Sequence, residues 1–278
     1  MLDERLEERL RERAKDAGDY AVVPYTWCRE VADMAGVSRR EMEIFALRRG
    51  LCPSRYERSI GTLGLDGQRK LLEASVAVAG CGGLGGVIVE LLARAGVGEL
   101  ILIDGDVFSD NNLNRQILCA EADIGRGKAE TARERALAVN GAVQTKVLRC
   151  YIDEENAGEC LAGASLVMDG LDNNRSRMIV LRECRGRGIP FVHGAIGGFW
   201  AQVGVFFPGD RSPWDGMTDP PDKGLELTLG NPPFTPAFAA SLQTALALGI
   251  LSGVRQATGG VLHWCDLSEL SMRSLKLA

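Results

Sequence analysis

The chain has 278 residues, of which 46% are hydrophobic and 25% are charged. This balance is ordinary for a folded protein with a sizeable core, and it excludes a largely disordered chain. The 32 lysines and arginines and the 37 aspartates and glutamates leave a formal net charge of −5, so we expect neither a nucleic-acid partner nor an anionic membrane surface.

The first residues are charged from position 3 onward, which is not the pattern of a secretory signal. The longest apolar stretch, residues 237–251, is interrupted by polar side chains and is shorter than the about 20 residues of a membrane span. We therefore expect a cytoplasmic protein. Its eight cysteines include no Cys-x-x-Cys pair, so the sequence predicts no paired-cysteine zinc site, and disulfides are not expected in this compartment.

Residues 1–52 are expected to form a small helical N-terminal extension. A charged helix is predicted over residues 2–15, and two short helices follow it. Ser38 and Glu41 form a capping box at the start of the second of these. The pattern around Gly36 resembles a helix-turn-helix, but such helix pairs are common packing units, so we do not expect DNA binding here.

From Ser75 onward, apolar runs typical of buried parallel strands alternate with helical segments. The predicted strands are 75–80, 99–104, 144–148, 165–169 and 190–193, and the predicted helices are 84–95, 127–140, 154–161 and 174–187. This order predicts an α/β fold, with a mostly parallel sheet that has helices on both faces.

The pattern changes after residue 193. A strand over 200–207 is expected to run antiparallel to its neighbour, and residues 208–233 are rich in Pro, Gly and Asp and are expected to form a long crossover loop. A helix over 234–252 and a hairpin over 261–276 complete the chain. We therefore expect antiparallel strands at the C-terminal end of the sheet.

A glycine-rich turn, Gly80-Cys-Gly-Gly-Leu-Gly85, lies between the first buried strand and its helix. The missing Cβ atoms let the backbone approach a phosphate, and the helix N-terminus offers free N–H groups. Asp104 ends the next strand, where a carboxylate can accept hydrogen bonds from ribose hydroxyls. These features alone fit NAD, FAD or ATP, and they also fit a purely structural turn.

Polar side chains follow the strand that ends at Asp104, and they are of the kind that stabilises charge on phosphoryl oxygens. The candidate cofactor-binding residues here are Asp106, Asn112, Arg115, Gln116 and Lys128. For Lys128, a solvated surface charge is the alternative interpretation. Asp172 and Asn173 follow the fourth strand, at the edge of the sheet where α/β proteins bind ligands, and Asp172 is a candidate ligand for Mg²⁺.

Together with Arg55-Tyr-Glu-Arg58-Ser, these motifs resemble those of the ThiF/MoeB/HesA family of ubiquitin-activating-enzyme-like adenylyltransferases. The resemblance covers residues 53–278 and implies a Rossmann-like adenylation domain there. It also implies ATP and Mg²⁺ as cofactors and a ubiquitin-like sulfur-carrier protein as partner. The implied reaction is ATP-dependent adenylation of the carrier's C-terminal Gly-Gly carboxylate, in thiamine or molybdenum/tungsten cofactor sulfur transfer.

The resemblance also implies roles for individual residues. It implies ribose binding by Asp104 and Mg²⁺ binding by Asp172. It implies that the phosphates lie against Gly80, Gly82, Gly83, Gly85, Asn112, Arg115 and Lys128. The implied catalytic residues are Arg115, Lys128, Asp172 and Arg58. Arg58 matches an arginine that members supply across a subunit interface, so a homodimer is implied.

Two departures from the family pattern change the expected chemistry. Many members hold zinc with two Cys-x-x-Cys pairs, but the corresponding stretches, 207–214 and 229–234, contain no cysteine, so we expect no zinc. The crossover loop also lacks a cysteine for a thioester or persulfide, so we expect the reaction to end at the acyl-adenylate. The alternatives are activation of a small-molecule, peptide or tRNA carboxylate, or a non-catalytic nucleotide-binding scaffold. Nicotinamide redox chemistry has less support, because no acid or base for hydride transfer stands out.

Overall fold

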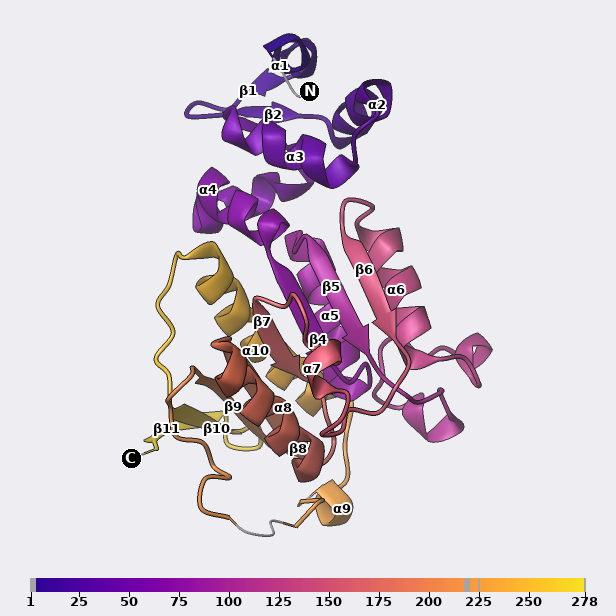
Figure 1. Cartoon of the computed structure of the whole chain (residues 1–278), viewed down its shortest axis with the longest axis vertical. Helices are drawn as coiled ribbons and strands as arrows, with labels where there is room; N and C mark the ends of the chain where they lie inside the picture. The colour runs from indigo at the N-terminus through magenta and orange to yellow at the C-terminus, as the bar shows by residue number, and fades with distance from the viewer. Residues whose placement is uncertain (1–3, 218–220, 225, 278) are drawn as a thin grey trace.

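The computed structural model describes residues 4–217, 221–224 and 226–277 (Figure 1). These residues include a three-stranded sheet near the N-terminus and an eight-stranded sheet that carries most of the helices. In Figure 1 the N-terminal elements lie at one end of the molecule and meet the rest through α4 (Ile60–Glu73). The expected α/β class is confirmed.

The N-terminal segment contains helices, as expected, and it also contains three short strands. Its elements are α1 (Glu4–Arg11), β1 (Lys15–Asp16), β2 (Ala21–Val23), α2 (Tyr25–Ala35), α3 (Arg39–Arg48) and β3 (Leu51–Pro53). Trp27, Val31 and Met42 belong to a small core of its own. The predicted capping box is present, because Ser38 Oγ accepts from the Glu41 N–H at 3.2 Å and Glu41 Oε2 accepts from the Ser38 N–H at 2.9 Å.

Helix α3 packs against α4, and its basic side chains are engaged there. Arg40 Nε donates to the Leu72 carbonyl oxygen at 2.6 Å, and Arg48 Nη2 lies 2.7 Å from Glu73 Oε1. In a helix-turn-helix protein this second helix would have to enter the major groove of DNA. Because α3 packs against α4, the structure fits the packing interpretation of the two helices.

The eight-stranded sheet has the order β11-β10-β9-β8-β7-β4-β5-β6, in which β8 to β6 are parallel and β9 to β11 are antiparallel, as expected. Its strands are β4 (Ser75–Ala79), β5 (Glu99–Ile103), β6 (Gln144–Leu148), β7 (Leu166–Asp169), β8 (Phe191–Gly197), β9 (Trp200–Phe206), β10 (Val261–Asp266) and β11 (Ser271–Lys276). The helices and turns are η1 (Ser54–Ser59), α4, α5 (Gly83–Ala95), η2 (Asp110–Asn112), η3 (Glu121–Asp123), α6 (Lys128–Val139), α7 (Ala157–Cys160), α8 (Asn174–Arg187), α9 (Glu226–Leu229) and α10 (Phe234–Ser252).

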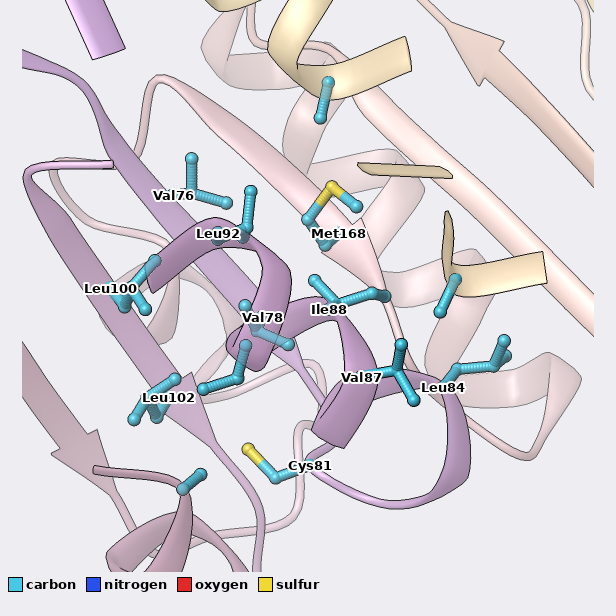
Figure 2. Packing of buried hydrophobic residues seen from close by; sticks show 14 of the residues in the cluster. Val76, Val78, Cys81, Leu84, Val87, Ile88, Leu92, Leu100, Leu102 and Met168 are labelled. Atoms are coloured by element: carbon cyan, nitrogen blue, oxygen red, sulfur yellow. The ribbon is translucent and has the colours of Figure 1, made fainter. Parts of the chain in front are cut away.

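Helices cover both faces of this sheet. Successive residues of a strand point to opposite faces, so each central strand contributes apolar side chains to two cores. Val76 and Val78 of β4 face a core that includes residues of α5, α6 and α10 (Figure 2). Ala77 and Ala79 face a second core formed with α7 and α8. The central strands β4, β5 and β7 are thus buried on both sides, and their parallel pairing places their carboxyl ends side by side.

One described helix, α10, is long and apolar enough to cross a membrane by length and composition alone. It packs against α4, α5, β8 and β9, and Ala239, Ala240 and Ala247 are fully buried. Buried Gln243 donates from Nε2 to the carbonyl oxygens of Asp169 and Val192 at 2.9 and 3.1 Å. These contacts are those of a helix in the core of the fold.

The two edge strands of the large sheet, β6 and β11, carry exposed cationic side chains. Lys146 lies on β6, and Arg273 and Lys276 lie on β11. The predicted crossover loop over 208–233 contains the short helix α9 among turns, and residues 218–220 and 225 lie outside the described part.

Candidate active site

A cleft of about 540 Å³ lies beside the carboxyl ends of β4, β5 and β7. This is the edge at which open α/β sheets bind ligands. The predicted residues that line it are Gly80, Gly82, Gly83, Asp104, Asp106, Asn112, Arg115, Gln116, Lys128, Asp172 and Asn173. The structure therefore brings together residues that are spread over more than ninety positions of the sequence.

The glycine-rich turn needs its glycines for two different reasons. Gly80 has a φ of +88°, and a Cβ on it would lie 2.6 Å from the Gly170 carbonyl oxygen. A Cβ on Gly85 would collide with the Gly80 carbonyl oxygen, so Gly85 lets α5 start tightly against the turn. Gly85 is not among the cleft-lining residues. The start of α5 leaves backbone N–H groups and a positive helix end at the cleft, which suits an anion.

Asp104 is fixed by the backbone around it. Its Oδ2 accepts from the Cys81 N–H at 2.7 Å, and its Oδ1 accepts from the Asp106 N–H at 2.8 Å. Burial raises the pKa of the Asp104 carboxyl above its ordinary value, although these two hydrogen bonds oppose the shift. Each carboxylate oxygen has a second acceptor position, so the group can still accept hydrogen bonds from ribose hydroxyls.

Lys128 is buried at the first position of α6 and does not behave as a solvated surface charge. Its Nζ lies 3.0 Å from Asp106 Oδ2, and Tyr151 Oη donates to Asp106 Oδ1 at 2.5 Å. Burial would raise the pKa of Asp106, but Tyr151 and Lys128 outweigh it and hold that pKa below its ordinary value. The ammonium is therefore held at the cleft by an ionised partner. The sequence patterns did not single out Tyr151.

Three further polar residues, Asn112, Arg115 and Gln116, line the cleft. Arg115 Nη1 donates to the Asn111 carbonyl oxygen and to Asn114 Oδ1, both at 2.8 Å, which leaves the other N–H groups of its guanidinium available. Asn112 and Gln116 are both buried, and Gln116 Oε1 has no hydrogen-bond partner in the described part of the chain. A buried amide with an unmet acceptor beside a cleft is suited to a polar ligand.

Asp172 and Asn173 connect β7 to α8. Asn173 caps the helix, since its Oδ1 accepts from the Ser176 N–H at 2.8 Å, and its Nδ2 donates to Asp172 Oδ1 at 3.2 Å. Asp172 Oδ2 also accepts a hydrogen bond from Lys223 Nζ at 2.6 Å. Partial burial would raise the pKa of Asp172, but Lys223 and Asn173 outweigh it and keep that pKa below its ordinary value.

A buried charge cluster supports the segment that carries Asp172. His193 Nδ1 and Arg177 Nε lie 2.7 and 3.1 Å from Asp169 Oδ2, and Arg177 Nη2 donates to the Leu171 carbonyl oxygen at 2.5 Å. Burial lowers the pKa of His193, although Asp169 opposes the shift. Arg177 also lines the cleft and a smaller neighbouring cavity of about 240 Å³. His193 lies in the strand predicted over 190–193, but no sequence pattern connects it with Asp169.

Arg58 lies in η1, is exposed, and is not among the residues that line the cleft. Its predicted role requires a second protomer and stays a prediction.

The fold and the cleft together define a Rossmann-like domain whose ligand-binding edge carries a glycine-rich turn, a lysine and an arginine. The model of the ThiF family matches residues 56–278, and the chain belongs to this family.

Characterised relatives agree with this membership. The molybdopterin-synthase adenylyltransferase of Salmonella typhimurium is 37% identical over 235 residues, which is 80% of this chain and 92% of that one. The sulfur carrier protein ThiS adenylyltransferase of Escherichia coli is 32% identical and covers 80% of this chain and 90% of its own length. The SAMP-activating enzyme E1 of Haloferax volcanii is 32% identical over 226 residues, 80% of this chain and 84% of that one.

Solved structures share the fold at lower identity. The microcin C7 biosynthetic enzyme MccB of E. coli, in complex with N-formylated MccA, has a TM-score of 0.72 at 20% identity and covers 90% of this chain and 83% of that one. PaaA has a TM-score of 0.69 at 21% identity, with 81% and 82% coverage.

Proposed function

We infer that this protein uses ATP to adenylate the C-terminal Gly-Gly carboxylate of a small ubiquitin-like sulfur-carrier protein. The observation that carries this inference is the cleft, where a glycine turn, Lys128 and Arg115 surround a volume bounded by Asp104 and Asp172. The relatives described above, a sulfur carrier protein ThiS adenylyltransferase and a molybdopterin-synthase adenylyltransferase, support it. We assign the activity to residues 53–278 and treat residues 1–52 as an extension.

In the proposed reaction a carboxylate oxygen of the carrier attacks the α-phosphorus of ATP. The bond from that phosphorus to the β-phosphate oxygen breaks, which gives the acyl-adenylate and pyrophosphate. A carboxylate is already ionised at neutral pH, so no general base is needed. Catalysis then consists of positioning and charge stabilisation, with Asp104 on the ribose and Asn112, Arg115 and Lys128 on the phosphates.

Mg²⁺ fits the carboxylate at the rim of the cleft. Asp172 Oδ2 already accepts a hydrogen bond from one cation, because Lys223 Nζ lies 2.6 Å from it. The position therefore suits a positive charge. Mg²⁺ is commonly held by one or two carboxylates together with substrate phosphates, and it would neutralise phosphate charge there. We propose no zinc site, a homodimer in which Arg58 serves the partner's cleft, and a cytoplasmic location.

The test is ATP–pyrophosphate exchange by the purified chain with Mg²⁺ and a panel of ubiquitin-like carriers that end in Gly-Gly. Exchange that depends on one carrier would support the proposal and identify the pathway. If the chain binds ATP tightly but no carrier supports exchange, the substrate is a small-molecule, peptide or tRNA carboxylate instead. If it neither binds ATP nor exchanges, the chain is a scaffold and the proposal is wrong.

A further inference from the structure

Lys223 reaches the cleft from the crossover loop, far in sequence from every nucleotide motif. Its Nζ donates to Asp172 Oδ2 at 2.6 Å and to the Asp172 carbonyl oxygen at 3.0 Å. It lines the same cleft as Lys128 and Arg115. A lysine in this place faces the carboxylate to which we assign the nucleotide's metal ion, so both cations compete for one anionic group.

The backbone before Lys223 is fastened to the first turn of α8. The Asn174 N–H donates to the Asp222 carbonyl oxygen at 2.9 Å, and Asn174 Nδ2 donates to the Pro221 carbonyl oxygen at 2.7 Å. The Arg175 N–H donates to Asp222 Oδ1 at 3.2 Å. Because α8 starts directly after Asp172 and Asn173, these bonds hold the base of the Lys223 side chain beside the cleft.

Two other cations of the cleft are paired with carboxylates to which we assign no metal ion. Lys128 is paired with Asp106, and Arg177 is paired with buried Asp169. Lys223 differs, because its partner Asp172 is the carboxylate that would bind the Mg²⁺ ion of the nucleotide. An ammonium on a flexible four-carbon stem that loses its carboxylate moves to the nearest negative charge, which in this cleft would be the phosphates.

We propose that Lys223 is a substrate-contacting residue of the adenylation reaction, an inference that rests on the function proposed above. Its ammonium neutralises Asp172 while the cleft holds no nucleotide, and it contacts the triphosphate when the nucleotide binds. There it stabilises the negative charge that develops on the departing pyrophosphate. Arginine at this position would retain the charge, whereas methionine would keep the length of the side chain and lose the charge.

The first test is equilibrium binding, measured by isothermal titration calorimetry on the full chain. The ligands are α,β-methylene-ATP, with and without Mg²⁺, and adenosine, which has no phosphate. Lys223→Met should weaken binding of the ATP analogue by roughly 10- to 100-fold, the scale for losing one charged hydrogen bond, and leave adenosine unchanged. Lys223→Arg should keep most of the affinity. Lys146→Met, an exposed lysine on β6, is the matched control and should bind like the wild type.

The second test is carrier-dependent exchange, in which Lys223→Met should lower the rate and raise the KM for pyrophosphate. Equal or tighter binding of the ATP analogue by Lys223→Met would overturn the proposal, because Lys223 would then only block Asp172. If the wild type binds the analogue but exchanges with no carrier, the proposed carrier function fails, and the binding comparison still decides the role of Lys223. If Lys223→Met melts well below the wild type, Lys223→Gln replaces it in both tests. If the wild type does not bind the analogue, both proposals are wrong.

Discussion

At the scale of single residues, Arg115 is the side chain whose loss we expect to affect the chemistry most clearly. Two oxygens of neighbouring residues, at Asn111 and Asn114, hold its guanidinium at the cleft. Arg115→Ala should lower carrier-dependent ATP–pyrophosphate exchange by roughly 10²- to 10³-fold, as for other lost stabilisers of developing charge. The melting temperature should stay near that of the wild type. Arg133→Ala, on the exposed face of α6, is the control, and a near-normal rate in Arg115→Ala would remove this residue from the mechanism.

The cysteines differ in their exposure, which predicts the order in which they react with thiol reagents. All eight are free, and Cys150 alone is half-buried, with its Sγ 3.6 Å from Cys160 Sγ. Burial raises the pKa of the Cys184 thiol to about 12, so almost none of it is thiolate at neutral pH. Iodoacetamide labelling followed by peptide mapping should modify Cys150 first. Labelling of Cys184 at the same rate in the folded protein would contradict this order.

Several residues of the cleft that could be predicted from the sequence are tied to the end of a strand or the start of a helix, whereas Asn112, Arg115 and Gln116 lie in or just after η2 and were predicted from their residue types. Asp104 follows β5 and Lys128 begins α6, so the topology determines their positions. Lys223, Tyr151 and Arg177 could not be predicted, because their contacts depend on how a loop folds back or on a side chain that crosses the core. Gly85 belongs to the motif, but its role in packing follows only from the close approach of α5 to the Gly80 carbonyl oxygen.

At the scale of elements, a buried polar network joins the N-terminal segment to the Rossmann-like part. Tyr56 of η1 donates to Glu43 Oε2 of α3 at 2.8 Å, and Asn140, after α6, donates to Tyr56 Oη at 3.0 Å. Arg55 Nε lies 3.4 Å from Glu43 Oε1, and Arg55 also contacts Asn140. Removal of residues 1–50 would leave the Tyr56 hydroxyl without its carboxylate and expose the face of α4. We therefore expect such a truncation to lower solubility.

The same network predicts a pH dependence of stability. Burial raises the pKa of Glu43 above its ordinary value of 4.5, although Arg55 and Tyr56 oppose the shift. The folded protein then binds this proton more tightly than the unfolded chain does. The contribution of Glu43 to the free energy of unfolding is largest below that ordinary value and falls as the pH rises through the folded pKa.

Urea unfolding of the wild type and Glu43→Gln at several pH values checks this sign. The free energy of unfolding of the wild type, minus that of Glu43→Gln, should decrease from about pH 4.5 upward, because glutamine does not titrate. Glu73→Gln, at the exposed salt bridge with Arg48, is the comparison variant. The pKa of Glu73 is lowered in the folded protein. The free energy of unfolding of the wild type, minus that of Glu73→Gln, should therefore increase as the pH rises. A difference for Glu43→Gln that does not change with pH would refute the shift.

Most long elements were predicted within one to three residues, because each shows a clear apolar pattern and an end signal. Helices α8 and α10 are examples, with the bounds that the sequence predicts. Helix α4 was not predicted, because its segment contains Gly61, Gly64 and Gly67 and is kinked at Gly64, where φ is +66°. The strands β1, β2 and β3 are two or three residues long, too short for a periodic pattern, and tertiary pairing alone defines them.

At the scale of the whole molecule, the proposed homodimer predicts that two inactive variants can restore one active site. If Arg58 serves the partner's cleft, Arg58→Ala and Arg115→Ala are each inactive alone. Mixed dimers formed after the subunits exchange would contain one cleft with both arginines intact, which gives roughly a quarter of wild-type exchange by random pairing. Size-exclusion chromatography should show the dimer. No recovery in mixtures that contain mixed dimers would place Arg58 outside the reaction.

The cations on β6 and β11 bear on how copies of this chain can assemble. Pairing an edge strand with the same strand of another copy would bring Lys146 against Lys146, or Arg273 and Lys276 against their counterparts, and like charges across a new ladder oppose it. The charges on both edge strands therefore oppose extension of the large sheet from one copy into the next. The same charges guard a protein with an eight-stranded sheet against edge-to-edge aggregation.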